Sequence, residues 1–218
     1  MSRNIDFVIS FVRHAESCGN VGIPYEHLYQ KDDPPLSPRG LSQAQKLCDS
    51  GLLTGIDRIY SSTLVRAVET VYPTAEKLNK NIILLSDLME DDTEIAGTEL
   101  LRLERDFPLA IPCTDPTPTG GPLVLGKESP EDRALRARRC IDYFFSTASD
   151  GEHIAVITHG SYFGYLVREA LGLSLPEGFC WQVDNCSVTR VIYRKDKAPK
   201  LSFANFTGHL GENPLLNI

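Results

Sequence analysis

The sequence lacks any apolar run long enough to cross a membrane. Its longest apolar stretches, residues 7–12 and 154–157, fall far short of the roughly 20 residues that a bilayer core of about 30 Å requires. The first residues also lack the order of basic, apolar and small residues that marks a secretory signal. We therefore expect a cytoplasmic protein that does not bind membranes.

Positive charge is also scarce. The chain has 22 Lys and Arg against 29 Asp and Glu, a formal net charge of −7. Nucleic-acid binding depends mainly on the neutralisation of phosphates by Lys and Arg, so this balance argues against a nucleic-acid partner. A basic cluster follows two acidic residues in a helical pattern, and we interpret it as a solvated, ion-paired helix face. The cluster consists of Arg133, Arg136, Arg138 and Arg139.

Metal-binding and disulfide patterns are missing as well. The six cysteines form no C-x-x-C pair, and without a secretory context they are expected to be reduced thiols. No H-x-H or paired-carboxylate spacing is found, so we expect neither a metal site nor a cofactor.

What the sequence does have is the composition of a globular protein. Hydrophobic residues make up 42% and charged residues 23% of the 218 residues, which is ordinary for a compact domain with a sizeable core. No Pro/Gly/Ser-rich linker divides the chain, so we predict a single domain over residues 1–218. Residues 111–126 are rich in Pro, Gly and Thr and are predicted to form a lid or loop.

Short β-branched runs alternate with longer helical patterns. This alternation predicts an α/β domain with a mostly parallel central sheet and helices on both faces. Strands are predicted over residues 6–12, 58–61, 81–85, 154–158, 187–193 and 201–205.

Serine and proline mark the helix starts. Ser37-Pro38 and Ser129-Pro130 predict two of them. Another helix is expected from about Leu64, which Pro73 should kink, end or divide, and a last one over residues 162–171. The helix after Ser37 should turn one apolar face to the sheet. That face is predicted to consist of Leu41, Ala44, Leu47 and Cys48.

Polar residues suited to phosphate chemistry follow several predicted strands. Arg13-His14 follows the first strand, residues 61–66 the second, and His159-Gly160 a later one, while Glu90 comes after the strand at residues 81–85. In open α/β sheets, ligands bind outside the carboxyl ends of the strands. The sequence therefore predicts that these residues meet in one pocket.

These segments carry a family resemblance. Residues 11–17, Phe-Val-Arg-His-Ala-Glu-Ser, resemble the Arg-His signature of the histidine phosphatase, or phosphoglycerate-mutase-like, superfamily. Further resemblances follow in the order that the family has, at residues 35–44, 61–70, 157–160 and 185–189. A lone Arg-His dipeptide is weak evidence, whereas the ordered set covers nearly the whole chain.

The resemblance implies that His14 carries the phosphoryl group. A neutral imidazole is a good nucleophile near pH 7, and phosphohistidine is labile enough to hydrolyse. Taken alone, His14 is better explained as a structural histidine at a strand end. The adjacent Arg13 and the downstream Arg66 and His159 favour the nucleophile.

The phosphate itself is expected to bind to arginine. The planar guanidinium groups of Arg13 and Arg66 can hold phosphate oxygens bidentately and stabilise transition-state charge without a metal. His159 is expected to act as an imidazolium or a neutral donor. The other predicted phosphate contacts are Gly160, Ser17 and Asn20.

A general acid must protonate the leaving oxygen, and its carboxyl needs a raised pKa. Glu90 matches the family position after the third strand. The glycine and aromatic spacing of the family is blurred here, and three further acidic side chains compete with Glu90. These are Asp91, Asp92 and Glu94.

We therefore predict a metal-independent phosphatase that hydrolyses a phosphorylated small molecule or, less favoured, a phosphoprotein. A phosphoglycerate mutase-type phosphotransferase is the first alternative. Such mutases usually carry an Asn- and Trp-rich stretch after the Arg-His signature, where this chain has Cys-Gly-Asn-Val-Gly at residues 18–22. An inactive phospho-ligand binding module and a metal-dependent phosphatase are the others.

Overall fold

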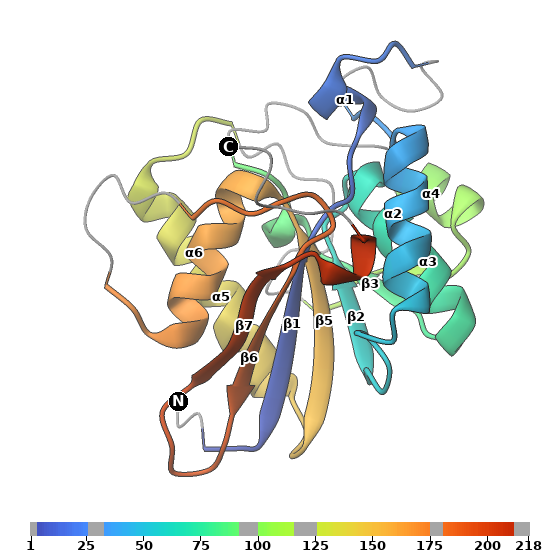
Figure 1. The fold of residues 1–218 in the computed structure, drawn as a ribbon. Helices are drawn as coiled ribbons and strands as arrows, with labels where there is room; N and C mark the ends of the chain where they lie inside the picture. Colours follow the sequence, from blue (N-terminus) through green and yellow to red (C-terminus); the bar gives the residue numbers. More distant parts are fainter. Residues whose placement is uncertain (1–3, 26–32, 92–99, 116–125, 175–180, 212–218) are drawn as a thin grey trace.

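The computed structural model describes residues 4–25, 33–91, 100–115, 126–174 and 181–211. Seven strands of this part form one sheet in the order β4-β3-β2-β5-β1-β6-β7 (Figure 1). The first five strands in that order pair in parallel. Strand β6 pairs antiparallel with β1 on one side and with β7 on the other. The strands are β1 (Phe7–Arg13), β2 (Arg58–Ser61), β3 (Ile82–Leu84), β4 (Ala110–Pro112), β5 (Glu152–Thr158), β6 (Val188–Tyr193) and β7 (Lys200–Phe206). The predicted α/β fold with a mostly parallel sheet is confirmed.

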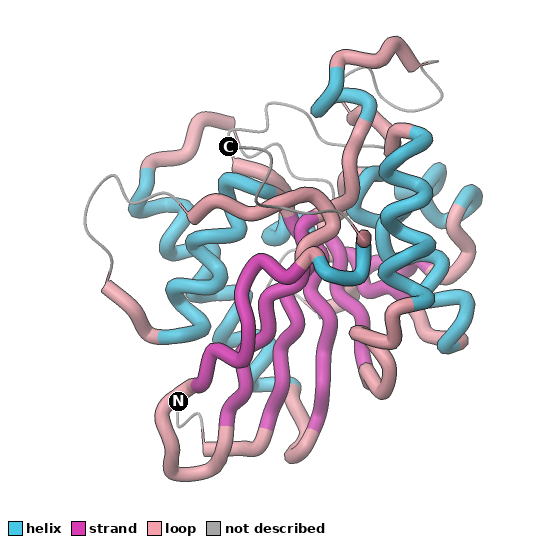
Figure 2. Tube along the Cα trace, in the orientation of Figure 1, coloured by secondary structure: helices cyan, strands magenta, loops and turns pink. Residues whose placement is uncertain are grey.

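Helices cover both faces of this sheet (Figures 1 and 2). One face is covered by α2 (Pro38–Asp49), α3 (Val65–Leu78) and α4 (Leu100–Asp106), the other by α5 (Pro130–Thr147) and α6 (Gly160–Leu171). Three short elements complete the described part: α1 (Cys18–Val21) and the 3₁₀ turns η1 (Ser86–Leu88) and η2 (Gly208–Leu210). The sequence analysis did not predict α1, α4 or the two 3₁₀ turns.

The two faces of β1 enter two separate cores because side chains alternate along a strand. Val12 packs with the α2 and α3 side, whereas Phe7, Ile9 and Phe11 pack with α5 and α6. A strand buried on both faces is typical of a parallel sheet between helix layers. This explains why the sequence of β1 is almost continuously apolar.

Both predicted serine helix starts are present. The Ser37 hydroxyl accepts a hydrogen bond from the Gly40 amide at 3.0 Å, and the Ser129 hydroxyl accepts one from the Asp132 amide at 3.1 Å. In each helix a proline occupies the first turn, where its missing N–H leaves no bond unmade.

Of the four residues predicted on the apolar face of α2, Ala44, Leu47 and Cys48 are buried, and the prediction is wrong for Leu41. Leu41 is exposed, whereas Gly40 and Gln43 are buried with Ala44 and Leu47. Gly40 lies so close to the loop after β1 that a Cβ atom there would be 1.9 Å from the Glu16 carbonyl oxygen. This backbone contact turns α2 so that Leu41 faces outward.

Two other expectations need correction in part. Pro73 lies inside α3 and neither ends nor divides it, because the helix continues past it to Leu78. The predicted loop at residues 111–126 begins inside β4, which pairs with β3, and residues 116–125 lie outside the described part. Where the chain is described, no helix is long and apolar enough to cross a membrane.

Candidate active site

The strand ends bring the predicted residues together. Strand pairing sets Arg13 opposite Thr158, and Ser61 opposite Ile157. The residues that follow these strands, His14, Ser62 and His159, therefore leave the sheet at the same edge. The imidazole rings of His14 and His159 are 5.0 Å apart between centroids, although 145 positions separate them in the sequence.

His14 is held in the tautomer that a nucleophile needs. Its Nδ1 lies 2.7 Å from the Ala15 carbonyl oxygen. Because a carbonyl oxygen can only accept, Nδ1 carries the proton and Nε2 keeps its lone pair. Burial, together with the positive charges of Arg66 and Arg13, lowers the pKa of His14 well below its usual value. The ring is therefore neutral at pH 7.

Arg13 is anchored at one end of its guanidinium group. Its Nη1 donates to the Val183 carbonyl oxygen at 2.6 Å, while its buried Nε has no hydrogen-bond partner in the described part of the chain. A Cβ atom on Gly160 would lie 3.2 Å from that Nε. The absence of a Cβ atom at Gly160 thus leaves room for the Arg13 side chain, and a contact between Gly160 and phosphate stays a prediction.

Arg66 has a partner that the sequence did not indicate. Its Nη1 lies 3.5 Å from Oδ1 of Asp33, a wholly buried carboxylate. Both Asp33 oxygens also accept from the Val65 amide at 3.1 Å, at the start of α3. Asp33 therefore fixes Arg66 through the helix N-terminus and through charge. No local pattern links positions 33 and 66, so only the fold reveals this pair.

His159 contacts the turn after β2. Its Nε2 lies 2.7 Å from the Ser62 hydroxyl oxygen, and its buried Nδ1 has no hydrogen-bond partner in the described part. Burial first, and then the charge of Arg66, lowers the pKa of His159 well below its usual value. The ring is neutral without a ligand, which favours the neutral donor over the imidazolium.

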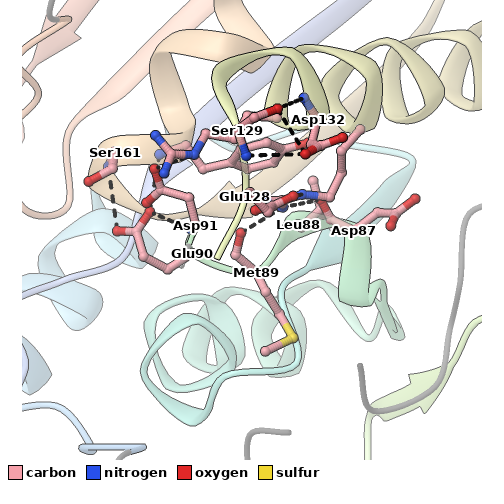
Figure 3. A network of polar contacts seen from close by, with 12 residues as sticks. Asp87, Leu88, Met89, Glu90, Asp91, Glu128, Ser129, Asp132 and Ser161 are labelled. Carbon is pink, nitrogen blue, oxygen red and sulfur yellow. Dashed lines mark hydrogen bonds and ion pairs between the residues drawn. The ribbon is translucent and has the colours of Figure 1, made fainter. Parts of the chain in front are cut away.

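Glu90 lies against the N-terminus of α6. Its carboxylate accepts from the Tyr162 amide at 3.1 Å and from the Ser161 amide at 3.4 Å (Figure 3). Burial, followed by the negative charge of Asp91, raises the pKa of Glu90 to about 7, although the α6 amide and Arg66 act in the opposite direction. Such a carboxyl can hold a proton near neutral pH.

The competing acids are placed differently. The Asp91 carboxylate lies 3.2 Å from Arg133. Asp92 and Glu94 lie outside the described residues. Of the two acids that the structure describes, Glu90 has the carboxyl close enough to Arg13 and Arg66 to alter the pKa of both.

Ser17 and Asn20 form the cap of α1 beside the site. The Asn20 side-chain oxygen accepts from the Ser17 amide and hydroxyl, both at 3.0 Å. It also accepts from Nδ2 of Asn185 at 3.2 Å, and that Nδ2 donates to the His14 carbonyl oxygen as well. A contact between Ser17 or Asn20 and phosphate stays a prediction.

Of the other three histidines, the two that the structure describes have surroundings different from those of His14 and His159. His153 bonds to Ser10 on the sheet, His209 lies in η2, and His27 is outside the described residues. Within the described ranges, no three His, Cys, Asp or Glu side chains are grouped as metal ligands would be. Two arginines instead supply positive charge next to two neutral imidazoles and a protonatable carboxyl.

Comparison with known proteins identifies the family of this chain. The family model described as histidine phosphatase superfamily, branch 1, matches residues 9–206. A probable phosphoglycerate mutase of Proteus mirabilis is 26% identical over 188 residues, or 85% of each chain.

Solved structures share the fold at lower identity. A phosphoserine phosphatase of Entamoeba histolytica, in complex with 3-phosphoglyceric acid, superposes with a TM-score of 0.66 at 20% identity, covering 94% of this chain and 99% of its own. A mycobacterial glucosyl-3-phosphoglycerate phosphatase in complex with VO₃ gives a TM-score of 0.63 at 18% identity, covering 92% and 99%.

Proposed function

The chain belongs to branch 1 of the histidine phosphatase superfamily, and we propose that it hydrolyses phosphate monoesters through a phosphohistidine on His14. One observation carries this proposal. The bond from Nδ1 of His14 to the Ala15 carbonyl leaves Nε2 with its lone pair. Burial first, and then the charges of Arg66 and Arg13, lower the pKa of His14 and favour the neutral ring.

In the first step, Nε2 of His14 attacks phosphorus. The P–N bond forms while the bond from phosphorus to the leaving oxygen breaks. Arg13, Arg66 and His159 hold the phosphoryl oxygens and stabilise their charge. Glu90, whose pKa is raised to about 7, gives its proton to the leaving oxygen, and the alcohol departs.

In the second step, water attacks the phosphohistidine. Glu90, now ionised, takes a proton from this water as the P–O bond forms and the P–N bond breaks. Inorganic phosphate leaves, and His14 and Glu90 regain their starting protonation states. Atoms and charge balance without a metal or an organic cofactor.

We favour a phosphorylated small molecule as the substrate over a phosphoprotein. The solved relatives are named for phosphoserine and glucosyl-3-phosphoglycerate, and one holds 3-phosphoglyceric acid. The cytoplasmic location and the absence of nucleic-acid and membrane partners stay predictions.

Phosphotransfer within a phosphoglycerate is the second candidate. The supporting observation is that four similar proteins, 24–27% identical, are named as probable phosphoglycerate mutases. A mutase would pass the phosphoryl group from His14 to another hydroxyl group instead of to water, so the two functions differ in the acceptor.

A panel of phosphorylated metabolites tests the proposal. We expect release of inorganic phosphate from at least one small monoester, and none when His14 is replaced by Ala. Interconversion of 2- and 3-phosphoglycerate without phosphate release would establish the mutase instead. Tight binding of a phosphorylated compound without either reaction would identify a binding module.

A further inference from the structure

Helix α5 contacts the loop that carries Glu90, and it does so through two arginines. Arg133 and Arg136 are three positions apart and therefore project from the same side of the helix. Both were expected on a solvated helix face. That expectation is wrong for Arg136, whose side chain is 1% exposed. A guanidinium group buried to this extent needs several partners.

Arg136 holds the backbone just before Glu90. Its Nη1 donates to the carbonyl oxygens of Asp87 and Met89, both at 2.9 Å. The residues of this loop, Asp87 to Asp91, lie together in Figure 3. Arg136 thus holds the loop through main-chain carbonyl oxygens, so this contact does not depend on the side chains of Asp87 and Met89.

Arg133 holds the residue just after Glu90. Its Nε lies 3.2 Å from Oδ2 of Asp91. Arg136 before Glu90 and Arg133 after it together prevent the loop from shifting along α5. We call these two residues the arginine clamp.

The clamp also contacts Tyr162, whose amide donates a hydrogen bond to Glu90. The guanidinium carbon of Arg136 lies 3.6 Å from the centre of the Tyr162 ring, and the amide of Tyr162 donates to Glu90. Tyr162 is fully buried, with its ring against the guanidinium group of Arg136. Arg136 therefore contacts both the loop that carries Glu90 and the N-terminal turn of α6, against which Glu90 lies.

Glu128 completes the surroundings of Arg136. Its two carboxylate oxygens accept from Nε and Nη2 at 2.8 and 2.5 Å. The guanidinium thus uses three of its nitrogens and one face at once. Lysine has a single ammonium group and cannot reproduce this planar, forked arrangement.

We infer that the arginine clamp is a positioning device, in which Arg136 and Arg133 hold Glu90 against the N-terminus of α6 at the place where its proton reaches the leaving oxygen. This inference rests on the proposed function, in which Glu90 is the general acid. A misplacement of about 1 Å in such a group can lower the rate about 10²-fold. Neither arginine touches the substrate in this scheme.

The kinetic test compares two esters. Arg133→Gln and Arg136→Lys should lower kcat/KM about 10-fold to 10²-fold for an alkyl phosphate, and less than about threefold for p-nitrophenyl phosphate, which needs no proton on its leaving group. The measured quantity is kcat/KM because it covers only the steps up to release of the alcohol, whereas kcat also contains hydrolysis of the phosphohistidine, which is the same for both esters. Arg133→Lys should recover most of the loss because Lys can still pair with Asp91. The matched control is Arg138→Gln, on the same helix but paired with Glu169, and both rates should stay unchanged.

A second measurement works without turnover. In the wild-type protein, the NMR shift of the Tyr162 amide should change with pH around 7 as its acceptor Glu90 titrates. The clamp variants should lose this change and exchange that amide proton faster, while Arg138→Gln should keep both properties. If Arg136→Lys does not fold, Arg133→Gln decides the question alone.

Two results would overturn the inference: equal losses on both esters, or a Tyr162 amide that behaves as in the wild type. A wild-type protein that hydrolyses no phosphate ester would refute the proposed function. In that case the Tyr162 measurement still decides whether the clamp holds Glu90.

Discussion

Replacing Glu90 by Gln removes the proposed acid and keeps nearly the same shape. Gln can still accept the shorter of the two amide hydrogen bonds, from Tyr162 at 3.1 Å, through its single oxygen, and it loses only the longer one from Ser161 at 3.4 Å. Arg136 also holds the main chain of the loop, so the loop should stay in place. The main difference between the two proteins is then a proton and a charge.

The size of the effect follows from the raised pKa. With a pKa of about 7, about nine tenths of Glu90 is protonated at pH 6, against about 3% for a carboxyl with the ordinary value of about 4.5. Burial therefore increases the acid form about 30-fold at that pH. General acid catalysis contributes about 10²–10⁴-fold for a poor leaving group. We expect kcat/KM for an alkyl phosphate to fall by that factor, and kcat/KM for p-nitrophenyl phosphate to fall by much less, because kcat/KM reports only the steps up to release of the alcohol.

The assay measures phosphate release from both esters between pH 5 and 9. For the wild type, kcat/KM for the alkyl ester should fall as pH rises through about 7, because Glu90 in the free enzyme loses its proton there. The ratio of the two losses in Glu90→Gln is the decisive quantity. Equal losses would mean that Glu90 only positions other groups. Full activity on both esters would move the search for the acid to Asp91, Asp92 and Glu94.

Three further predictions concern other parts of the molecule. His14→Ala should abolish turnover and the acid-labile phosphoenzyme that labelled substrate would otherwise leave, and label on serine would refute the covalent step. EDTA should leave activity unchanged, because Arg13 and Arg66 supply the positive charge, and vanadate should inhibit; loss with EDTA that a divalent ion restores would support a metal enzyme. Burial raises the pKa of Glu69 to about 7, so its ionisation should destabilise the folded state as pH rises from about 4.5 to about 7. Glu69→Gln should therefore unfold like the wild type at pH 4.5 but be more stable at pH 8, by up to about 3 kcal/mol in chemical denaturation; an equal difference at both pH values would contradict this.

The sequence alone was enough to predict six of the seven strands of the sheet and the residues that meet at its edge. The apolar runs that became β1 and β5 could hardly be anything but strands buried on both faces, and Ser37 and Ser129 mark their helices through local capping bonds. Since parallel strands end at one edge of a sheet, it also followed that His14 and His159 would meet there. All these features depend on residues close in sequence or on the general topology of α/β sheets.

Only the tertiary structure decided the features that depend on contacts between distant segments. The pairing of Arg66 with Asp33 spans more than thirty positions, and α2 is turned by the approach of Gly40 to the Glu16 carbonyl. The helical charge pattern around Arg136 is typical of a solvated surface, and it is the packing of α5 on the Glu90 loop that buries that side chain. The choice between Glu90 and Asp91 has the same origin, because desolvation and the amides of α6 act on one carboxyl while Arg133 holds the other. Neighbouring acids in a sequence look alike, and their surroundings in the fold make them chemically different.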